Sequence, residues 1–153
     1  MPVGLRFNEV VESKTVVNLD VFNGSNKVVV GNYKDNAIDV GDMNQFAEFN
    51  NNSNEQAGAT KQGKMIHETR EQFWKALKGQ GMGSMKYVNT GHEIAVGFEN
   101  SVNGNTRLPD LMPGRNQGIV EQFQRTNGTV VKLLIIGGQN SPSKPIIVVK
   151  PYQ

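Results

Sequence analysis

Cysteine is absent from this chain of 153 residues, which excludes disulfide bonds, a thiol nucleophile and a cysteine-ligated zinc site. No apolar run approaches the roughly 20 residues that a membrane-spanning helix needs, so we expect no membrane span. Residues 1–8 do not lead into an apolar stretch and are therefore not typical of a signal peptide. If the protein is secreted or injected, we expect a dedicated system to carry it; otherwise we expect it in the cytoplasm.

The net positive charge is also low for a nucleic-acid-binding protein. The formal net charge is +2, and lysine and arginine are scattered rather than gathered in runs. Nucleic acid is therefore not a favoured partner. The hydrophobic content of 37% and the charged content of 20% are those of an ordinary globular protein. The length predicts a single globular domain over residues 1–153.

Hydrophobic periodicity predicts strands in the first forty residues. Apolar residues recur with a period of about two over 15–22, and Asn23-Gly24 is a strong turn signal. We expect residues 27–30 to pair back onto this strand as a hairpin. Residues 37–40 are a shorter candidate strand, which a short helix over 43–49 follows.

Two helices are expected in the middle of the chain. Residues 60–78 carry apolar side chains on one stripe at helical spacing, and Gly79 ends the pattern. A second helix should begin near Thr90 or Gly91 and run to about Ser101, with Thr90 as its N-cap.

The C-terminal third predicts strands again. Pro and Gly residues make 108–118 a loop, and 119–123 is ambiguous between strand and helix. Residues 129–136 and 145–150 are rich in β-branched side chains and predict two strands. The order of elements indicates an α+β fold, an antiparallel sheet with two central helices packed on it.

The chemistry-bearing residues are concentrated at the two histidines of the chain, because His67 and His92 are each followed directly by glutamate. With nine glutamates present, composition alone would produce this about 0.3% of the time. Histidine and glutamate bind divalent metals and move protons near neutral pH. The pairing therefore indicates one place where chemistry can occur.

Helical spacing puts His67 and Glu71 on one face, one turn apart, which is how a helix offers two ligands to one metal ion. The pattern differs from the familiar zinc motif, because Glu71 replaces its second histidine; Glu68 still occupies the general-base position. His92, at the start of the next expected helix, would complete a zinc-like site with an open position for water. Glu99 shares the helix face of His92 and is a candidate acceptor for an imidazole N–H or an alternative ligand.

Simpler interpretations exist for these residues. The helix face of His67 can be solvated surface, with Glu71 paired to Lys75 four residues on. His92 can be a helix cap or a half-buried polar residue.

Four other side chains have two interpretations each. Trp74 is either a cleft wall or core, and Tyr87 is either an oxyanion donor or core. Arg107 and Arg115 form either an anion clamp or ordinary surface.

Residues 63–73 resemble the toxin-like C-terminal domains of some Rhs-type and related polymorphic proteins of bacteria, which carry a "HE..E" helix followed by a second helix with a histidine. Residues 91–95 take the second place and 37–42 resemble the lead-in, so the resemblance covers roughly 37–105. It implies a metallopeptidase-like effector that acts on a protein or peptide. Its expected partners are a cognate immunity protein or a secretion apparatus. The implied metal ligands and base are the residues given above: His67, Glu71, His92 and Glu68.

Two alternatives stay open beside this leading hypothesis of a small, peptidase-like, metal-dependent hydrolase. Gly91-His92-Glu93 is similar to the "GHE" signature of HNH/endonuclease VII-like nuclease toxins, in which the histidine would activate water against a phosphodiester. A net charge of +2 is low for such a nuclease. The third class is a non-catalytic binding or cargo module.

Overall fold

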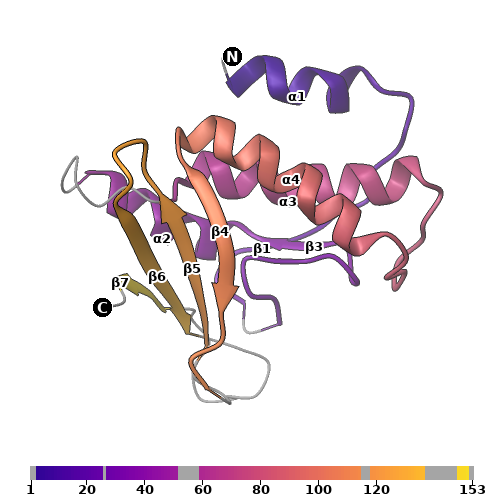
Figure 1. The fold of residues 1–153 in the computed structure, drawn as a ribbon. Helices are drawn as coiled ribbons and strands as arrows, with labels where there is room; N and C mark the ends of the chain where they lie inside the picture. Colours follow the sequence, from indigo (N-terminus) through magenta and orange to yellow (C-terminus); the bar gives the residue numbers. More distant parts are fainter. Residues whose placement is uncertain (1–2, 26, 52–58, 115–117, 137–147, 152–153) are drawn as a thin grey trace.

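The computed structural model describes residues 3–25, 27–51, 59–114, 118–136 and 148–151 (Figure 1). Helices and strands together confirm the α+β class. The helices are α1 (Val3–Glu12), α2 (Val40–Asn51), α3 (Lys61–Leu77) and α4 (Val88–Asn103). The strands are β1 (Asp20–Phe22), β2 (Gly31–Asn32), β3 (Ala37–Asp39), β4 (Thr106–Leu111), β5 (Ile119–Gln124), β6 (Val130–Ile136) and β7 (Val148–Pro151).

The predicted hairpin near the N-terminus is wrong. Strand β1 runs parallel to β3, and β2 pairs with the other edge of β3 in an antiparallel sense, in the order β1-β3-β2. The reason is a contact distant in sequence: the buried carboxylate of Asp39 accepts the backbone N–H groups of Gly24, at 2.7 Å, and Ser25, at 2.6 Å. The turn is thereby bound to the end of β3 instead of closing a hairpin.

The N-terminal helix α1 was not expected from the sequence, which suggested strands throughout this region. Glu9 of α1 accepts a hydrogen bond from Arg70 of α3 at 2.5 Å. The guanidinium of Arg70 in turn lies 3.9 Å from the ring centroid of Phe98. Tertiary contacts of this kind outweigh weak local preferences in so short a segment.

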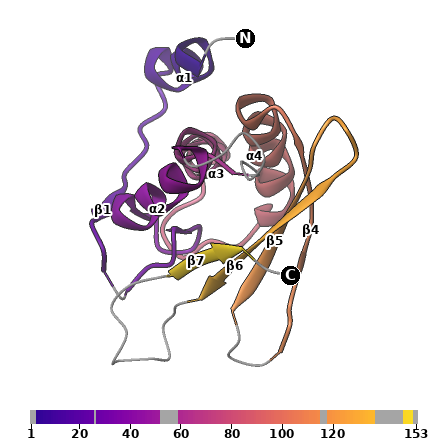
Figure 2. The ribbon, with the colours of Figure 1, turned by 90° about the vertical axis from the view of Figure 1, so that its left-hand side faces the viewer.

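Helices α3 and α4 form an antiparallel pair that lies side by side (Figures 1 and 2). The predicted helix over 60–78 is confirmed, and Thr60 is its N-cap: the Thr60 hydroxyl accepts from the Gly63 N–H at 2.8 Å and donates to Asn103 at the end of α4. Gly79, with φ 67°, follows the last turn of α3 as expected. The antiparallel arrangement places the start of α4 beside the middle of α3.

The start of α4 differs from the prediction. Thr90 lies inside the helix, and Tyr87 occupies the N-cap position with a left-handed backbone, φ 66°, and no side-chain capping bond. Because the chain turns through its backbone at Tyr87 and not through a side-chain cap, a threonine pattern could not locate this boundary.

The second sheet is antiparallel, in the order β4-β5-β6-β7. The predicted loop over 108–118 is wrong in its first part, because Thr106–Leu111 forms strand β4. Pro109 is tolerated there because β4 is an edge strand, and the register shifts between Leu108 and Leu111. The ambiguous segment is strand β5, and β6 agrees with the prediction. Of the expected last strand, 148–150 lie in β7 and 145–147 lie outside the described residues.

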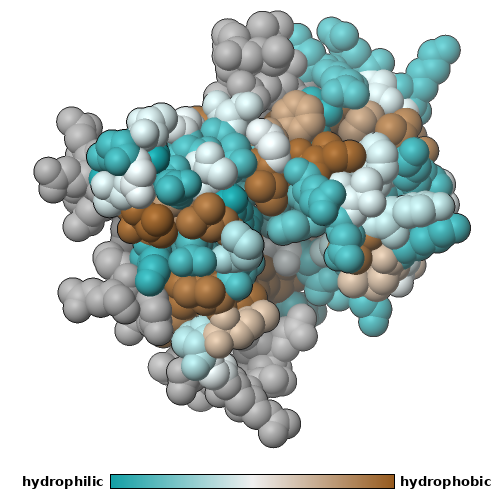
Figure 3. Space-filling view, in the orientation of Figure 1, coloured by the Kyte–Doolittle hydropathy of each residue, from teal (hydrophilic) through white to brown (hydrophobic). Residues whose placement is uncertain are grey.

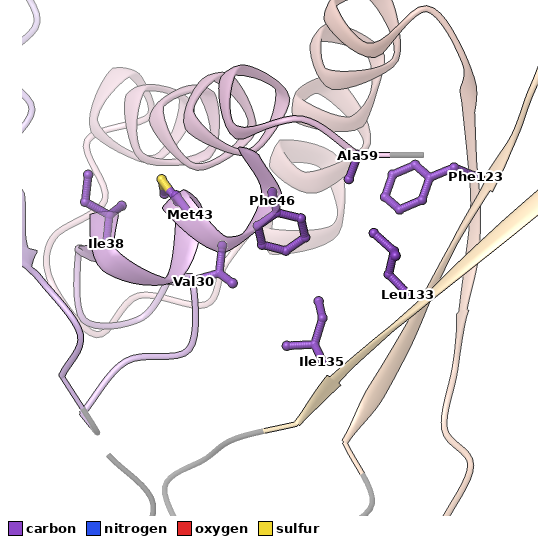
Figure 4. Packing of buried hydrophobic residues seen from close by; sticks show 8 residues of the cluster. All are labelled: Val30, Ile38, Met43, Phe46, Ala59, Phe123, Leu133 and Ile135. Atoms are coloured by element: carbon purple, nitrogen blue, oxygen red, sulfur yellow. The ribbon is translucent and has the colours of Figure 1, made fainter. Parts of the chain in front are cut away.

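The main apolar cluster joins α2 to the second sheet (Figure 4). Phe46 of α2 faces Phe123 of β5 and Leu133 of β6, whereas Met43 lies farther along α2, beside Ile38. Since Glu121 pairs with Leu133 in the β5–β6 register, its carboxylate lies on this same core face. The sheet thus presents one acid to the interior, which requires a cation opposite it.

The predicted architecture of one sheet needs correction, because the described residues form two sheets and the smaller one is mixed. Apolar groups on the face seen in Figure 3 are in separate patches among polar ones. No described helix has both the length and the apolar character needed to span a membrane.

Candidate metal centre

His67, Glu71 and His92 converge between α3 and α4. His67 and Glu71 are one turn apart on α3, and His92 faces them from the first turns of α4. Glu71 Oε1 lies 3.2 Å from His67 Nε2 and 2.8 Å from His92 Nδ1. The two imidazole rings meet edge to face, with centroids 4.9 Å apart. One ligand atom from each residue lies within 4.8 Å of the others, so the three lie close enough to bind one metal ion.

The distances within this triad can be compared with those around a small divalent ion. Bonds of about 2.0–2.2 Å in a tetrahedral site put ligand atoms roughly 3.3 Å apart. The two separations from Glu71 Oε1, 2.8 and 3.2 Å, differ from this value by a few tenths of an ångström, and all three ligand atoms lie within 4.8 Å of one another. His67 and Glu71 are buried, whereas the side chain of His92 is 44% exposed. The solvent-accessible side of the triad is therefore at His92.

Glu99 orients the imidazole of His67. Its Oε2 lies 2.8 Å from His67 Nδ1, the ring nitrogen that does not face Glu71. A carboxylate that accepts from Nδ1–H leaves Nε2 as the metal-binding nitrogen, which is the usual arrangement behind a zinc-bound histidine. Of the two roles expected for Glu99, the structure has the acceptor role.

A buried ion network holds Glu99 in place. Lys64 Nζ lies 3.0 Å from Glu99 and 2.5 Å from Glu121, the acid on the core face of β5. Arg107 lies 3.0 Å from each of the same two carboxylates. Burial alone raises the pKa of Glu99, but Lys64, His67 and Arg107 lower it well below its usual range. Glu99 is therefore an ionised acceptor at neutral pH.

Both interpretations of Arg107 are wrong: its side chain is 7% exposed and so is not ordinary surface, and its guanidinium is occupied by Glu99, Glu121 and Asp110 and so is not free to clamp an anion. Arg115, its expected companion, lies outside the described residues. The arginine instead belongs to the support of the triad.

The side chain of Glu68 points in a different direction from that of its neighbour His67. Its carboxylate is buried and packs against the backbone of β2, where a methyl group on Gly31 would overlap it. Burial and the negative charge of Glu71 raise the pKa of Glu68 to about 7. A general base works best when its pKa is close to the working pH, so the raised pKa agrees with the role predicted for Glu68. The position of its carboxylate, against Gly31, does not test that role, which stays a prediction.

Charge inside the triad is arranged as an ion pair. Burial lowers the pKa of His67, but hydrogen bonds with Glu71 and Glu99 outweigh this effect and raise it to about 9. Burial raises the pKa of Glu71, but the hydrogen bonds from His67 and His92 lower it to about 2. A cation that binds here would replace the proton on His67 Nε2, with Glu71 already ionised.

The interpretation of this α3 face as solvated surface is wrong. His67 and Glu71 are 3% and 6% exposed, and Lys75 does not pair with Glu71. Lys75 is itself buried, and its ammonium donates to the backbone carbonyl of Tyr33. The interpretation of Tyr87 as a core residue is also wrong, because Tyr87 is 46% exposed at the N-cap of α4, with Lys86 over its ring.

Tyr33 lies beside the triad and was not singled out in the sequence. It follows β2, and its ring and that of Trp74 both contact Gly91, the residue before His92. A single tyrosine in a short polar turn carries no local signal, because its place beside Gly91 depends on packing across nearly sixty residues. No protein-family model matches this chain, and no curated protein and no solved structure is significantly similar to it.

Proposed function

We propose that this protein is a small metal-dependent hydrolase of the peptidase-like kind. His67, Glu71 and His92 would hold a divalent ion, zinc by its preference for nitrogen and carboxylate ligands, and Glu68 would be the general base. The observation that carries the proposal is the triad itself: three ligand atoms within 4.8 Å, with the imidazole of His67 oriented by a buried acid. A histidine on a solvated surface helix would not need a buried acid to orient its imidazole.

The residues divide the chemistry among them. A bound divalent ion supplies polarisation of the substrate carbonyl and a lowered pKa for water. Glu68, with a pKa near 7, accepts the proton of the attacking water and can return it to the leaving amine. Glu99 holds His67 by its Nδ1–H, and Lys64 and Arg107 keep Glu99 ionised. The side chains of Lys64, Glu99 and Arg107 are buried, whereas that of His92 is 44% exposed, so we expect water and substrate to reach the ion from the side of His92.

A protein or peptide is the substrate that the surroundings of the triad favour. The loop from α3 to α4 ends at Tyr87, five residues before His92, and it exposes Met82, Met85 and Tyr87. Exposed apolar side chains in the loop before a metal ligand suit a substrate that carries both apolar side chains and peptide carbonyls. The wider role, that of a bacterial effector delivered into another cell and restrained by an immunity protein, is supported by the resemblance of residues 37–105.

The test is cleavage of a peptide library by the zinc-loaded protein, followed by mass spectrometry. We expect cleavage by the wild type and at least a ~100-fold lower rate for Glu68→Gln, since a positioned general base contributes about 10²–10⁴-fold. Glu93→Gln, an exposed glutamate after the other histidine, is the matched control and should cleave normally.

The nuclease alternative is tested in parallel with supercoiled plasmid DNA and Mg²⁺. DNA cutting that His92→Ala abolishes and Glu68→Gln leaves intact would replace the peptidase proposal. If no peptide in the library is cut, DNA stays intact and neither histidine affects any measured property, the binding-module class would stand instead.

A further inference from the structure

A buried hydroxyl near the triad has no hydrogen-bond partner. Tyr33 is 7% exposed, and its Oη makes no hydrogen bond within the described part of the chain. Leaving a buried polar group unpaired costs about 1–3 kcal/mol, so such a group calls for an explanation. At an enzyme centre, the explanation is often a partner that arrives with the substrate.

The ring of Tyr33 is beside the candidate metal ligands. Its Cε2, two bonds from the hydroxyl oxygen, lies 3.5 Å from the place where a Cβ on Gly91 would be. His92 follows Gly91 directly, and the charge of Glu71 is close enough to act on the phenol. The hydroxyl therefore belongs to the surroundings of the triad.

A second unmet donor lies next to the same glycine. Trp74 Cδ1 is 2.9 Å from the Cβ position of Gly91, and the adjacent indole Nε1 also finds no partner among the described residues. A side chain at position 91 would overlap the Trp74 ring, so both rings can pack against this position only because it is glycine. Two unpaired donors at one place indicate a binding position for a hydrogen-bond acceptor.

Tyr33 is held firmly from α3. The buried ammonium of Lys75 lies 4.9 Å from the ring centroid and donates to the backbone carbonyl of Tyr33. Gln72 donates to the carbonyl of Asn32, one residue earlier, at 3.2 Å. A donor fixed in this way needs no reorganisation during a reaction, which is the condition for stabilising a developing negative charge.

Burial and the charge of Glu71 raise the pKa of Tyr33, so its hydroxyl stays protonated and able to donate throughout the physiological range. We propose that Tyr33 is a catalytic residue whose hydroxyl donates a hydrogen bond to the substrate oxygen that becomes an oxyanion, beside the ion held by His67, Glu71 and His92. This inference rests on the proposed hydrolase function. The ligand class is an acyl group or its tetrahedral analogue.

The test uses acetohydroxamate, a small zinc-binding analogue of an acyl group, with the zinc-loaded full chain. Isothermal titration would compare the wild type with Tyr33→Phe, and with Tyr87→Phe as the matched control at an exposed tyrosine. We expect the Kd for acetohydroxamate to rise about tenfold in Tyr33→Phe and not in Tyr87→Phe, as for the loss of one hydrogen bond. The zinc content should be equal in all three proteins.

A second measurement does not need the variant to fold. With tyrosine labelled by ¹³C at Cζ, acetohydroxamate should shift the Tyr33 resonance of the wild-type zinc protein and leave that of Tyr87 unchanged. Equal acetohydroxamate affinity in Tyr33→Phe and wild type, or an unmoved Tyr33 resonance, would overturn the inference while the hydrolase proposal stands. If the wild type binds no zinc, the hydrolase proposal itself fails.

Discussion

Replacing the proposed general base should stabilise the protein. Glu68 is buried, and its pKa is raised from 4.5 to about 7 by burial and by the charge of Glu71. Its ionised form is therefore unfavourable in the folded state. Glu68→Gln keeps the shape of the side chain and removes the ionisation, so we expect a gain in unfolding free energy at high pH together with the loss of hydrolysis.

The magnitude follows from linkage between protonation and folding. Below pH 4.5 the Glu68 carboxyl is protonated in both the folded and the unfolded chain, so its ionisation does not lower the unfolding free energy of the wild type. As the pH rises from 4.5, the carboxyl ionises in the unfolded chain first, and the unfolding free energy falls until the folded protein ionises as well, at about pH 7. One unit of pKa corresponds to about 1.4 kcal/mol, so Glu68→Gln should gain about 3 kcal/mol at pH 8.5 and less than about 1 kcal/mol at pH 5.

Urea unfolding with EDTA present, at pH 5 and pH 8.5, measures this difference. Glu93→Gln, on the exposed side of α4, should show no comparable dependence on pH. A Glu68→Gln protein that is less stable than the wild type at pH 8.5, or equally stabilised at both pH values, would refute the reasoning about this buried acid.

Three further predictions concern the same centre. Glu99→Gln should raise the zinc Kd about 10–100-fold in a chelator competition assay, because the loss of an orienting acid has effects of this size. Zinc affinity should rise with pH up to about 9, by at most tenfold per pH unit, because the proton on His67 Nε2 must leave; titration calorimetry at several pH values would detect this. Gly31→Ala should displace the Glu68 carboxylate and slow hydrolysis roughly 100-fold, with zinc content unchanged by elemental analysis.

Local sequence patterns were sufficient to predict helix α3 and the convergence of the three residues of the triad. The helix was predictable because its apolar stripe and Gly79 lie within one continuous segment. His67 and Glu71 were predictable because four-residue spacing on a helix fixes their common face. His92 was predictable as their neighbour because the second helix was expected to run back along the first after a short loop.

Contacts between distant segments account for what the sequence did not reveal. The turn at Gly24 is bound by Asp39, fifteen residues away, so its hairpin signal was misleading. Glu121 became a partner of Lys64 through the register of β5 against β6, which no local pattern encodes. Tyr33 reached the triad in the same way, through the packing of its turn against Gly91.

The account depends most directly on one zinc ion held by the three residues of the triad. Elemental analysis of the purified protein after dialysis against zinc and then against zinc-free buffer would test it, with the wild type beside His92→Ala and Glu93→Ala. His92 is half-exposed, so its replacement should leave the fold intact. We predict about one equivalent of zinc in the wild type and in Glu93→Ala, and almost none in His92→Ala. Equal zinc in all three folded proteins, or none in any of them, would contradict the account.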